Sequence, residues 1–252
     1  MKSMKWQVKA LKMGDLTVEK STLLYCQDYG EKIRIPMWSV AIYGNGCNIL
    51  VDTGIDECGW IIQKLSPCER QPNEDIVSAI KEQLGWSPDD VDIIINTHLH
   101  HDHCGENRSF KNCRFYVQEK EYQAAMNPAE HQKKLYKRDL FDQNAVNYFD
   151  WVFVKGEEEI LPGIKVIPTP GHSAGQQSVL VNTEEGILCI TGDVANLVEN
   201  VNRQIPVTFA VSLVDELASL KRIREIADFI IPGHEPSIRN GQTGGFPRVE
   251  KD

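Results

Sequence analysis

Four histidines and one aspartate fall within six consecutive residues, directly after the apolar segment Asp92–Ile95. They are His98, His100, His101, Asp102 and His103. Imidazole and carboxylate groups are ligands for zinc, iron and manganese, and a strand that ends in a loop can direct alternate side chains into one pocket. Because the chain has only seven histidines in 252 residues, this concentration favours a metal site over a chance surface cluster.

Three more side chains with metal-binding groups occupy similar positions later in the chain. His172, Asp193 and His234 each follow a glycine that ends or closely follows an apolar segment. Those segments are Ile164–Ile167, Ile187–Ile190 and Phe229–Ile230. Glycine permits the tight turns and the close backbone approach that a crowded metal pocket needs. Each motif alone is weak evidence, but together with the first cluster they predict one shared metal centre.

Short strands and helices alternate along the chain, which predicts an α/β protein with two layers of sheet. The expected strands are Trp38–Tyr43, Asn48–Val51, Val91–Ile95, Arg114–Val117, Ile164–Ile167, Ser178–Val181 and Ile187–Ile190. We expect a helix at Asn73–Leu84, capped by Asn73 and stopped by Gly85, and another within Ser212–Asp228. The polar stretch Glu119–Tyr148 is expected to be a long helix interrupted at its proline.

Length and charge limit the class of protein. A chain of 252 residues fits one large domain. Lysine and arginine total 27 against 36 aspartates and glutamates, which gives a net charge of −9. Such a chain repels phosphate backbones, so we expect no nucleic-acid partner. No apolar run approaches the ~20 residues needed to span a bilayer, so we expect no membrane partner either.

The cysteines and the N-terminus favour a cytoplasmic protein. Seven cysteines are an odd number, and they form no Cys-x-x-Cys pair. That pattern does not predict a disulfide framework, and a reducing compartment accounts for it better. The first twelve residues alternate charged and apolar side chains, unlike a signal peptide.

The histidine and aspartate pattern resembles the signature of the metallo-β-lactamase superfamily. That signature is HxHxDH followed by separate His, Asp and His ligands, and here it reads His98-x-His100-x-Asp102-His103, then His172, Asp193 and His234. The early Asp52-Thr-Gly54 turn also matches, so the resemblance covers almost the whole chain. Within the superfamily the chain is most similar to the N-acyl homoserine lactone lactonases. The segments that carry this similarity are Pro36–Trp38, Val117–Ala125 and Thr169–Ser178.

The resemblance implies an αβ/βα sandwich of a single domain over residues 1–252, with a helical cap-like segment at about 119–150. It also implies two divalent metal ions, zinc being favoured over iron or manganese. The implied ligands are His98, His100 and His172 for the first metal, Asp102, His103 and His234 for the second, and Asp193 as a bridge. A metal-bound hydroxide would then attack the carbonyl carbon of a small lactone or related ester.

Roles can also be expected for other residues in or near these motifs. Asp102 is expected to act in catalysis as a ligand that also moves a proton to the leaving group. Asp52 is expected to order the loop beneath the metals through hydrogen bonds rather than to bind metal. The side chain of His101, at the variable position of the signature, is expected to point away from the metals. Cys104 is expected to be a buried small residue and His131 a solvated one.

The chain departs from the lactonase pattern at two places. Those lactonases have a tyrosine three residues after the bridging aspartate, where this chain has Asn196. An asparagine amide can also donate a hydrogen bond to an oxyanion, so Asn196 is a second candidate catalytic residue. The segment between Asp56 and Asn73 is shorter than the loop that binds the acyl chain in the family. Both departures concern the choice of substrate more than hydrolysis itself.

Several alternative functions share parts of this pattern. Thioester hydrolases of the glyoxalase II type share the ligand set, and other ester or lactam hydrolases are also compatible with it. Persulfide dioxygenases use one iron, exported β-lactamases carry a signal peptide, and nucleases need a basic face, so each fits less well. A non-catalytic metal-binding role is the non-enzyme alternative. The expected partner is a small lactone or ester, and the expected assembly is a monomer or a homodimer.

Overall fold

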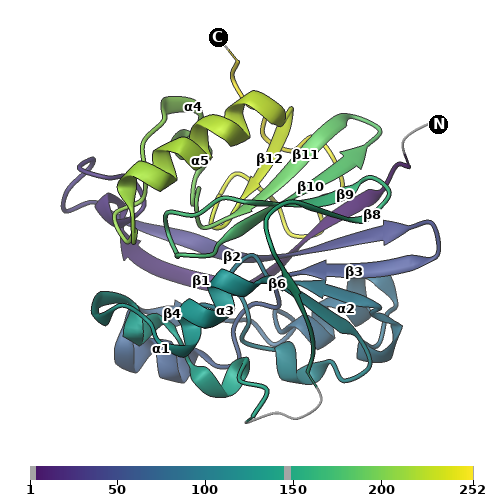
Figure 1. Ribbon diagram of the computed structural model, residues 1–252. Helices are drawn as coiled ribbons and strands as arrows, with labels where there is room; N and C mark the ends of the chain where they lie inside the picture. Colours follow the sequence, from purple (N-terminus) through teal and green to yellow (C-terminus); the bar gives the residue numbers. More distant parts are fainter. Residues whose placement is uncertain (1–3, 145–148, 252) are drawn as a thin grey trace.

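Two β-sheets packed face to face form the centre of the computed structural model, which describes residues 4–144 and 149–251 (Figure 1). The first sheet contains, in order across it, β4 (Cys68–Glu69), β1 (Gln7–Glu19), β2 (Lys32–Gly44), β3 (Cys47–Val51), β5 (Ile93–Ile95), β6 (Arg114–Gln118) and β7 (Asp150–Val154). The second contains β12 (Phe229–Pro232), β11 (Gly186–Gly192), β10 (Gln177–Thr183), β9 (Ile164–Pro168) and β8 (Glu158–Leu161).

Helices cover the outer faces of both sheets (Figure 1). The α-helices are α1 (Cys58–Lys64), α2 (Ile76–Leu84), α3 (Glu119–Met126), α4 (Val198–Arg203) and α5 (Leu213–Ile226). Short 3₁₀ helices lie at Lys20–Thr22, Pro88–Asp90, Asn107–Ser109, Glu130–Leu135 and Arg138–Leu140. Helix α2 packs on the first sheet, while α4 and α5 pack on the second.

Alternation of side chains along each strand divides the hydrophobic core into layers. In β5, Ile93 and Ile95 enter the core between the two sheets, whereas Ile94 enters the core beneath α2. In β3, Val51 and Leu50 divide in the same way. Burying such a side chain contributes about 1.5–3 kcal/mol relative to leaving it exposed, which fixes the register of the strands. The expected αβ/βα sandwich is thus confirmed.

All seven predicted strands are confirmed, with their ends moved by a few residues. The strand expected at Trp38–Tyr43 is the centre of the longer β2, and the other six correspond to β3, β5, β6, β9, β10 and β11. Strands β1, β4, β7 and β8 were not predicted from the sequence. Strand β1 is thirteen residues long, and Gly14 marks a shift in its register with β2 between Lys12 and Asp15. This interruption hides the simple alternation that predicts a strand.

The helix predictions are partly wrong. Helix α2 begins at Ile76, and its cap is Asp75, whose Oδ1 accepts a hydrogen bond from the Ser78 amide at 2.8 Å. Asn73 therefore does not cap this helix, although Gly85 ends it as expected in a left-handed conformation with φ of 74°. Helix α5 is confirmed, and its Ser212 cap accepts from the amide of Asp215.

The stretch Glu119–Tyr148 is not one long helix. Among its described residues, 119–144, only α3 is α-helical, and short 3₁₀ turns follow it as far as Leu140. Residues 145–148, which the expected cap-like segment also includes, lie outside the described residues. Pro128 cannot continue the hydrogen-bond ladder of a helix and disfavours helical backbone at Asn127, which has φ of −141° and ψ of 69°.

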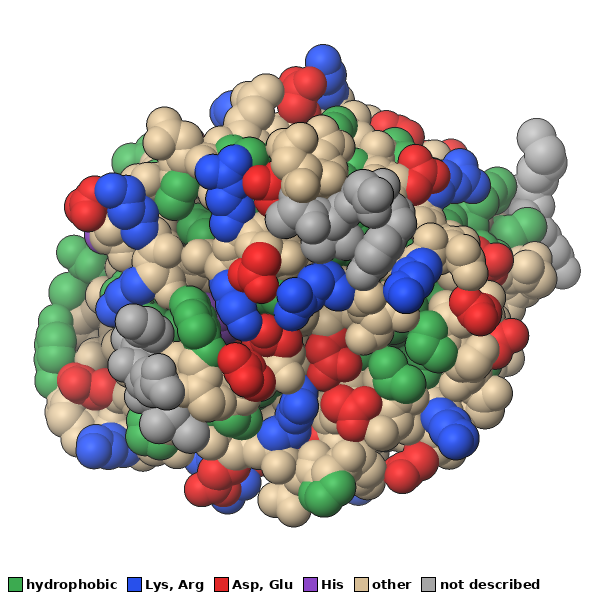
Figure 2. Space-filling view, turned by 90° about the horizontal axis from the view of Figure 1, so that it is seen from below, with side chains coloured by type: hydrophobic (Ala, Val, Ile, Leu, Met, Phe, Trp, Pro, Cys, Tyr) green, Lys and Arg blue, Asp and Glu red, His purple; other side chains and the backbone are tan. Residues whose placement is uncertain are grey.

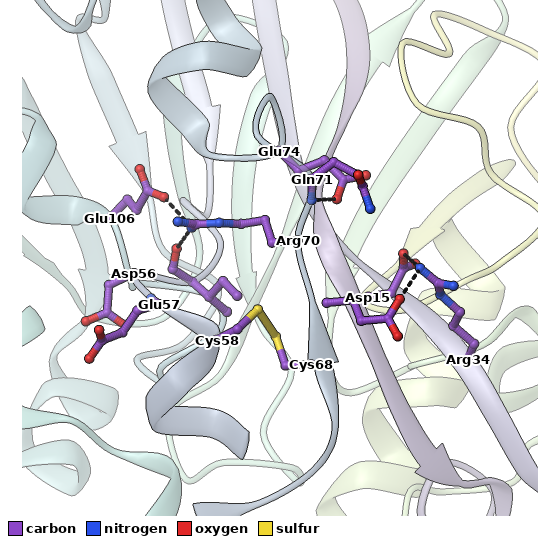
Figure 3. Close-up of a disulfide and its surroundings, with 12 residues drawn as sticks. Asp15, Arg34, Asp56, Glu57, Cys58, Cys68, Arg70, Gln71, Glu74 and Glu106 are labelled. Carbon is purple, nitrogen blue, oxygen red and sulfur yellow. Dashed lines mark hydrogen bonds and ion pairs between the residues drawn. A yellow bond between two sulfur atoms is a disulfide. The ribbon is translucent and has the colours of Figure 1, made fainter. Parts of the chain in front are cut away.

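A disulfide joins Cys58 at the start of α1 to Cys68 in β4 (Figure 3). This bond corrects the expectation, drawn from the cysteine count, of a chain with reduced cysteines. The spacing of ten residues gave no sign of the pairing, because it depends on β4 folding back against α1. The other five cysteines are free.

The surface mixes charges of both signs. On the face beneath the helices of the first sheet, lysine and arginine side chains lie among aspartates and glutamates (Figure 2). Lys137 pairs with Asp56 and Arg108 with Asp139 between neighbouring loops. Across the described part of the chain, no helix has the length and apolar character needed to cross a membrane.

Candidate metal centre

Seven histidine and aspartate side chains meet where the two sheets end. His98, His100 and His172 form one group, and Asp102, His103, Asp193 and His234 form a second. Within each group the atoms able to bind a metal lie within 4.8 Å of one another, and all seven residues are buried. The first sheet supplies the four residues that follow β5, while the second supplies the three that follow β9, β11 and β12.

The carboxylate of Asp193 lies between the two groups. Its Oδ1 is 3.1 Å from His103 Nε2, and its Oδ2 is 3.2 Å from His234 Nε2. The same Oδ2 is 3.7 Å from His172 Nε2 in the other group. One carboxylate therefore faces ligand atoms of both groups, which is the arrangement that two neighbouring cations would share.

Several atoms of this cluster have no hydrogen-bond partner although they are buried. They include Nε2 of His98 and Nε2 of His100, both in the first group. An unpaired buried polar group costs about 1–3 kcal/mol, so proteins rarely leave several together. A cation coordinated by these atoms would remove that cost. The donor set of imidazole and carboxylate fits divalent zinc, iron or manganese.

Hydrogen bonds from outside the cluster orient two of the imidazoles. Asp52 Oδ2 lies 2.7 Å from His103 Nδ1, and both oxygens of Asp52 also accept bonds from Thr97. His234 Nδ1 lies 2.8 Å from the carbonyl oxygen of Pro36. Each contact places the proton on Nδ1 and turns Nε2, with its lone pair, toward the cluster.

Burial and neighbouring charges set the protonation of the cluster. Burial lowers the pKa of His98 well below its ordinary value, and the adjacent His103 lowers it further. Burial alone would raise the pKa of Asp193, but His234 and His103 hold it well below its ordinary value. Burial would lower the pKa of His103 and His234, but Asp193 raises both above their ordinary value, so a metal bound by these two imidazoles would have to displace a proton from each.

The remaining histidines and Cys104 lie outside the two groups. His101 is buried, and its ring packs edge-to-face on Trp60 with the ring centres 4.8 Å apart. His131 is exposed. Cys104 is buried, and its Sγ donates to the carbonyl oxygen of Leu99.

Glu121, a buried carboxylate on α3 that was not predicted from the sequence, joins the loops that carry His98–His103 and His172. Its Oε1 accepts from the amide of Leu99, inside the first motif. Its Oε2 accepts from Ser173 Oγ at 2.6 Å and from the Gly175 amide, just after His172. Glu121 lies within the Val117–Ala125 similarity, but a glutamate in a short polar helix gives no sign of burial.

The segment after α3 also supports the ligand loops. The Tyr136 ring packs edge-to-face on His100 with the ring centres 4.6 Å apart, and its hydroxyl donates to Glu121. Gln132 donates to the carbonyl oxygen of His172 at 2.6 Å. These contacts join positions far apart in the chain, so no local pattern indicates them.

Glycine at position 233 is required by the approach of Asp193. A Cβ atom built on Gly233 would lie 2.1 Å from Oδ1 of that aspartate, which is too close for any side chain. Gly171 has φ of 144°, and a Cβ there would lie 2.3 Å from the Cβ of Glu216 on α5. Both Pro-Gly-His turns therefore need glycine for packing, and the turn at Gly171 needs it for its backbone conformation as well.

A cavity of about 400 Å³ opens beside the cluster. Asp102, Asp193, His234 and Asn196 line its polar end. Apolar side chains line much of the rest, among them Leu16, Ile35, Ile61, Leu65 and Phe209. The Oδ1 atom of Asn196 is buried without a hydrogen-bond partner. None of the described residues that line this cavity is a tyrosine.

Known proteins share this sequence and fold. Residues 35–234 match the family model described as the metallo-beta-lactamase superfamily. An N-acyl homoserine lactonase of Bacillus cereus is 30% identical over 229 residues, which covers 84% of this chain and 85% of that protein. The solved structure of an N-acyl homoserine lactone hydrolase, with the product N-hexanoyl-L-homoserine bound at its catalytic metal centre, superposes with a TM-score of 0.81. That comparison covers 94% of this chain and 98% of the other, at 27% identity.

A more distant structure shares the fold alone. AidC, a dizinc quorum-quenching lactonase, has 15% identity and a TM-score of 0.72, and the comparison covers 100% of this chain and 97% of the other. The family match spans more than half of the chain and includes all seven clustered residues. The chain therefore belongs to the metallo-beta-lactamase superfamily, in which the N-acyl homoserine lactonases are among its relatives.

Proposed function

We propose that this protein is a metal-dependent hydrolase that opens the ring ester of N-acyl homoserine lactones or closely related lactones. The observation that carries the proposal is the buried cluster of seven ligand residues at one end of a largely apolar cavity. The cluster suits a polar ester, and the apolar walls suit an acyl chain. The relationship to N-acyl homoserine lactonases supports the same substrate class.

Two divalent metal ions would be held by the two groups, with zinc as the proposed metal. His98, His100 and His172 would hold one ion, and Asp102, His103 and His234 the other. Asp193 would hold both, because its two oxygens face both groups. Ions bound in this way lower the pKa of water to near neutrality and withdraw electrons from a carbonyl oxygen.

Asp102 would move a proton between water and the leaving group. It lines the cavity, and its Oδ2 lies 3.8 Å from His234 Nε2. Burial would raise the pKa of Asp102, but His101 and His103 hold it below its ordinary value. The carboxylate therefore stays ionised at neutral pH and can accept the proton of the attacking water. Passing that proton to the ring oxygen completes the cleavage to a hydroxyl and a carboxylic acid.

Asn196 would stabilise the negative charge that develops on the carbonyl oxygen. Its side chain lines the cavity near the cluster and is 6% exposed. The backbone carbonyl of Asn196 accepts from the His234 amide at 2.9 Å, which fixes the turn that carries it. In this chain the amide of Asn196 would take the place of the tyrosine hydroxyl at the matching position of the lactonases.

A pH-stat assay combined with metal analysis tests the proposal, because each ring opening at neutral pH releases one proton. We expect two metal ions per chain and turnover of N-acyl homoserine lactones faster than of thioesters or phosphoesters. The Asp193→Ala variant is expected to hold about one ion or fewer and to lose activity, whereas the surface variant Asp89→Ala should retain both. Faster turnover of thioesters would instead assign a thioester hydrolase, and bound metal without turnover of any ester would assign a non-catalytic role.

A further inference from the structure

The disulfide between Cys58 and Cys68 encloses a segment that forms part of the cavity wall. Between these cysteines the chain forms α1 and then turns back into β4 (Figure 3). Ile61 and Leu65 of this segment line the cavity, and Ser66 and Pro67 line it next to them. The disulfide therefore closes a loop whose inner surface faces the proposed acyl chain.

The Cys68 end of this loop is firmly attached to the first sheet. Strand β4 pairs with β1, and the Thr17 amide donates to the carbonyl oxygen of Pro67 at 2.9 Å. Arg70 donates to the carbonyl oxygen of Ile55 at 2.8 Å and to Glu106 at 2.9 Å (Figure 3). Arg34 joins Glu69 to Asp15 on β1. These contacts do not depend on the disulfide.

The α1 end is attached by side-chain contacts rather than by strand pairing. The helix has only seven residues and contains Gly59, and the side chain of Glu57 at its N-cap does not cap it. Isolated helices of this length are unstable in water. Besides the disulfide, the described side chains that attach α1 include Ile61, which is buried, Trp60, which packs on His101, and the ion pairs of Lys137 with Asp56 and Glu57 at its start. The disulfide is the covalent link that joins the start of α1 directly to β4.

We propose that the Cys58–Cys68 disulfide is a redox-controlled determinant of substrate selectivity, which holds α1 against the cavity when oxidised and releases it when reduced. This inference rests on the proposed lactonase function, because it assigns the wall beside α1 to the acyl chain. Long acyl chains would contact Ile61 and Leu65, whereas a short chain would remain near the metal ligands. Reduction should therefore weaken the enzyme toward long chains and leave short chains almost unaffected.

The chemistry of the switch is thiol–disulfide exchange with a dithiol, or with two molecules of a monothiol such as glutathione. A thiolate of the reductant attacks one sulfur, the Cys58–Cys68 bond breaks, and the second thiol of the reductant releases the mixed disulfide. Two electrons and two protons pass to the protein, which gains two thiols, and the reductant becomes a disulfide. Cys58 is half-buried and Cys68 is buried, so the sulfur of Cys58 is the one that a reductant reaches.

The test compares the metal-loaded protein with its Cys58→Ser/Cys68→Ser variant, which lacks the disulfide without any reductant to compete for metal. Cys26→Ser, which removes an exposed free cysteine, is the matched control. Kinetics on butanoyl and dodecanoyl homoserine lactone give the ratio of the two kcat/KM values. Alkylation and mass spectrometry count the thiols of the wild type in oxidised and reduced glutathione, and hydrogen exchange follows the amides of residues 58–66.

We expect five alkylated thiols in the oxidised protein and seven after reduction. The double variant should lose about tenfold or more in kcat/KM on the dodecanoyl substrate, mainly through KM, and less than about threefold on the butanoyl substrate. Its amides in α1 should exchange faster, while Cys26→Ser should match the wild type. An unchanged ratio of the two substrates would overturn the inference, as would seven thiols in oxidised glutathione.

A failure of the proposed lactonase function can be distinguished from a failure of the disulfide inference. If no form of the protein hydrolyses any lactone, the lactonase assignment is wrong, and binding of N-dodecanoyl-homoserine by calorimetry then decides the inference. Weaker binding to the double variant than to the wild type would support a disulfide-held apolar wall. Equal binding would overturn it.

Discussion

At the scale of single residues, Asn196 is the side chain whose role most needs a test. It lines the cavity together with Asp193 and His234, and its amide can donate there only through Nδ2, because Oδ1 can only accept. An amide that donates to a developing oxyanion typically contributes ~10²–10³-fold to kcat. We expect Asn196→Ala to lower kcat on the preferred lactone by about this factor with little change in KM. The exposed Asn112→Ala variant serves as control, and unchanged kcat in Asn196→Ala would leave Asn196 as a loop residue only.

Sequence could predict which residues meet at the site but not what supports them. His98 to His103 stand within one motif, and glycine before His172 and His234 marks the other turns. The partners of these residues come from tertiary contacts. Glu121 bonds to Leu99 and Ser173 across 22 and 52 positions, and no local pattern encodes such distances.

At the scale of elements, helix α5 positions the loop that carries His172. Its Glu216 packs against Gly171, and the amides of Val211 and Ser212 donate to the carbonyl oxygen of Gly171. Glu216 is fully buried, with Oε1 accepting from the Val207 amide at 2.7 Å and Oε2 unpaired. Burial raises the pKa of Glu216 to about 8. At neutral pH the folded protein therefore keeps the Glu216 carboxyl mainly protonated.

This pKa makes the stability of the protein depend on pH through α5. The folded state binds the proton of Glu216 more tightly than the unfolded chain does, so protonation of Glu216 stabilises the fold. This stabilisation is complete below the ordinary pKa near 4.5 and is lost as pH rises to about 8. Glu216→Gln keeps the acceptor for Val207 and cannot ionise. As pH rises between these values, the free energy of unfolding of the wild type should fall relative to that of Glu216→Gln. The difference between the two should grow by up to about 1.4 kcal/mol per pH unit. Urea unfolding from pH 5.5 to 9 measures the difference, and parallel curves would refute it.

The control for this effect is Glu225→Gln, which changes an exposed glutamate on the same helix and whose unfolding curve should follow that of the wild type.

Helix α5 was also predictable from sequence, since Ser212 and the apolar spacing mark it. The stretch after Glu119 was not, because the short turns beyond Met126 exist through contacts such as Gln132 with His172. An element can be predicted from sequence where its local pattern favours the same structure as its tertiary contacts. It cannot be predicted where tertiary contacts alone determine the backbone.

In the molecule as a whole, the cluster of proposed metal ligands joins the two sheets. The first sheet contributes the residues that follow β5, and the second contributes His172, Asp193 and His234. The hydrophobic core between the sheets also holds them together, so loss of metal should loosen this edge rather than unfold the domain. Without a cation, the close carboxylate and imidazole groups would also remain buried with unpaired atoms.

Removal of metal by a chelator should therefore lower the melting temperature. A ligand present at 1,000 times its Kd stabilises the folded state by ~4.1 kcal/mol per site, and each kcal/mol shifts Tm by about 2–4 °C in a chain of this size. We expect a fall of roughly 10 °C or more in differential scanning calorimetry, reversed by adding zinc. Asp193→Ala should show a smaller fall, because it has lost the carboxylate that faces both groups. Equal melting temperatures with and without metal would mean that the two sheets do not share a bound ion.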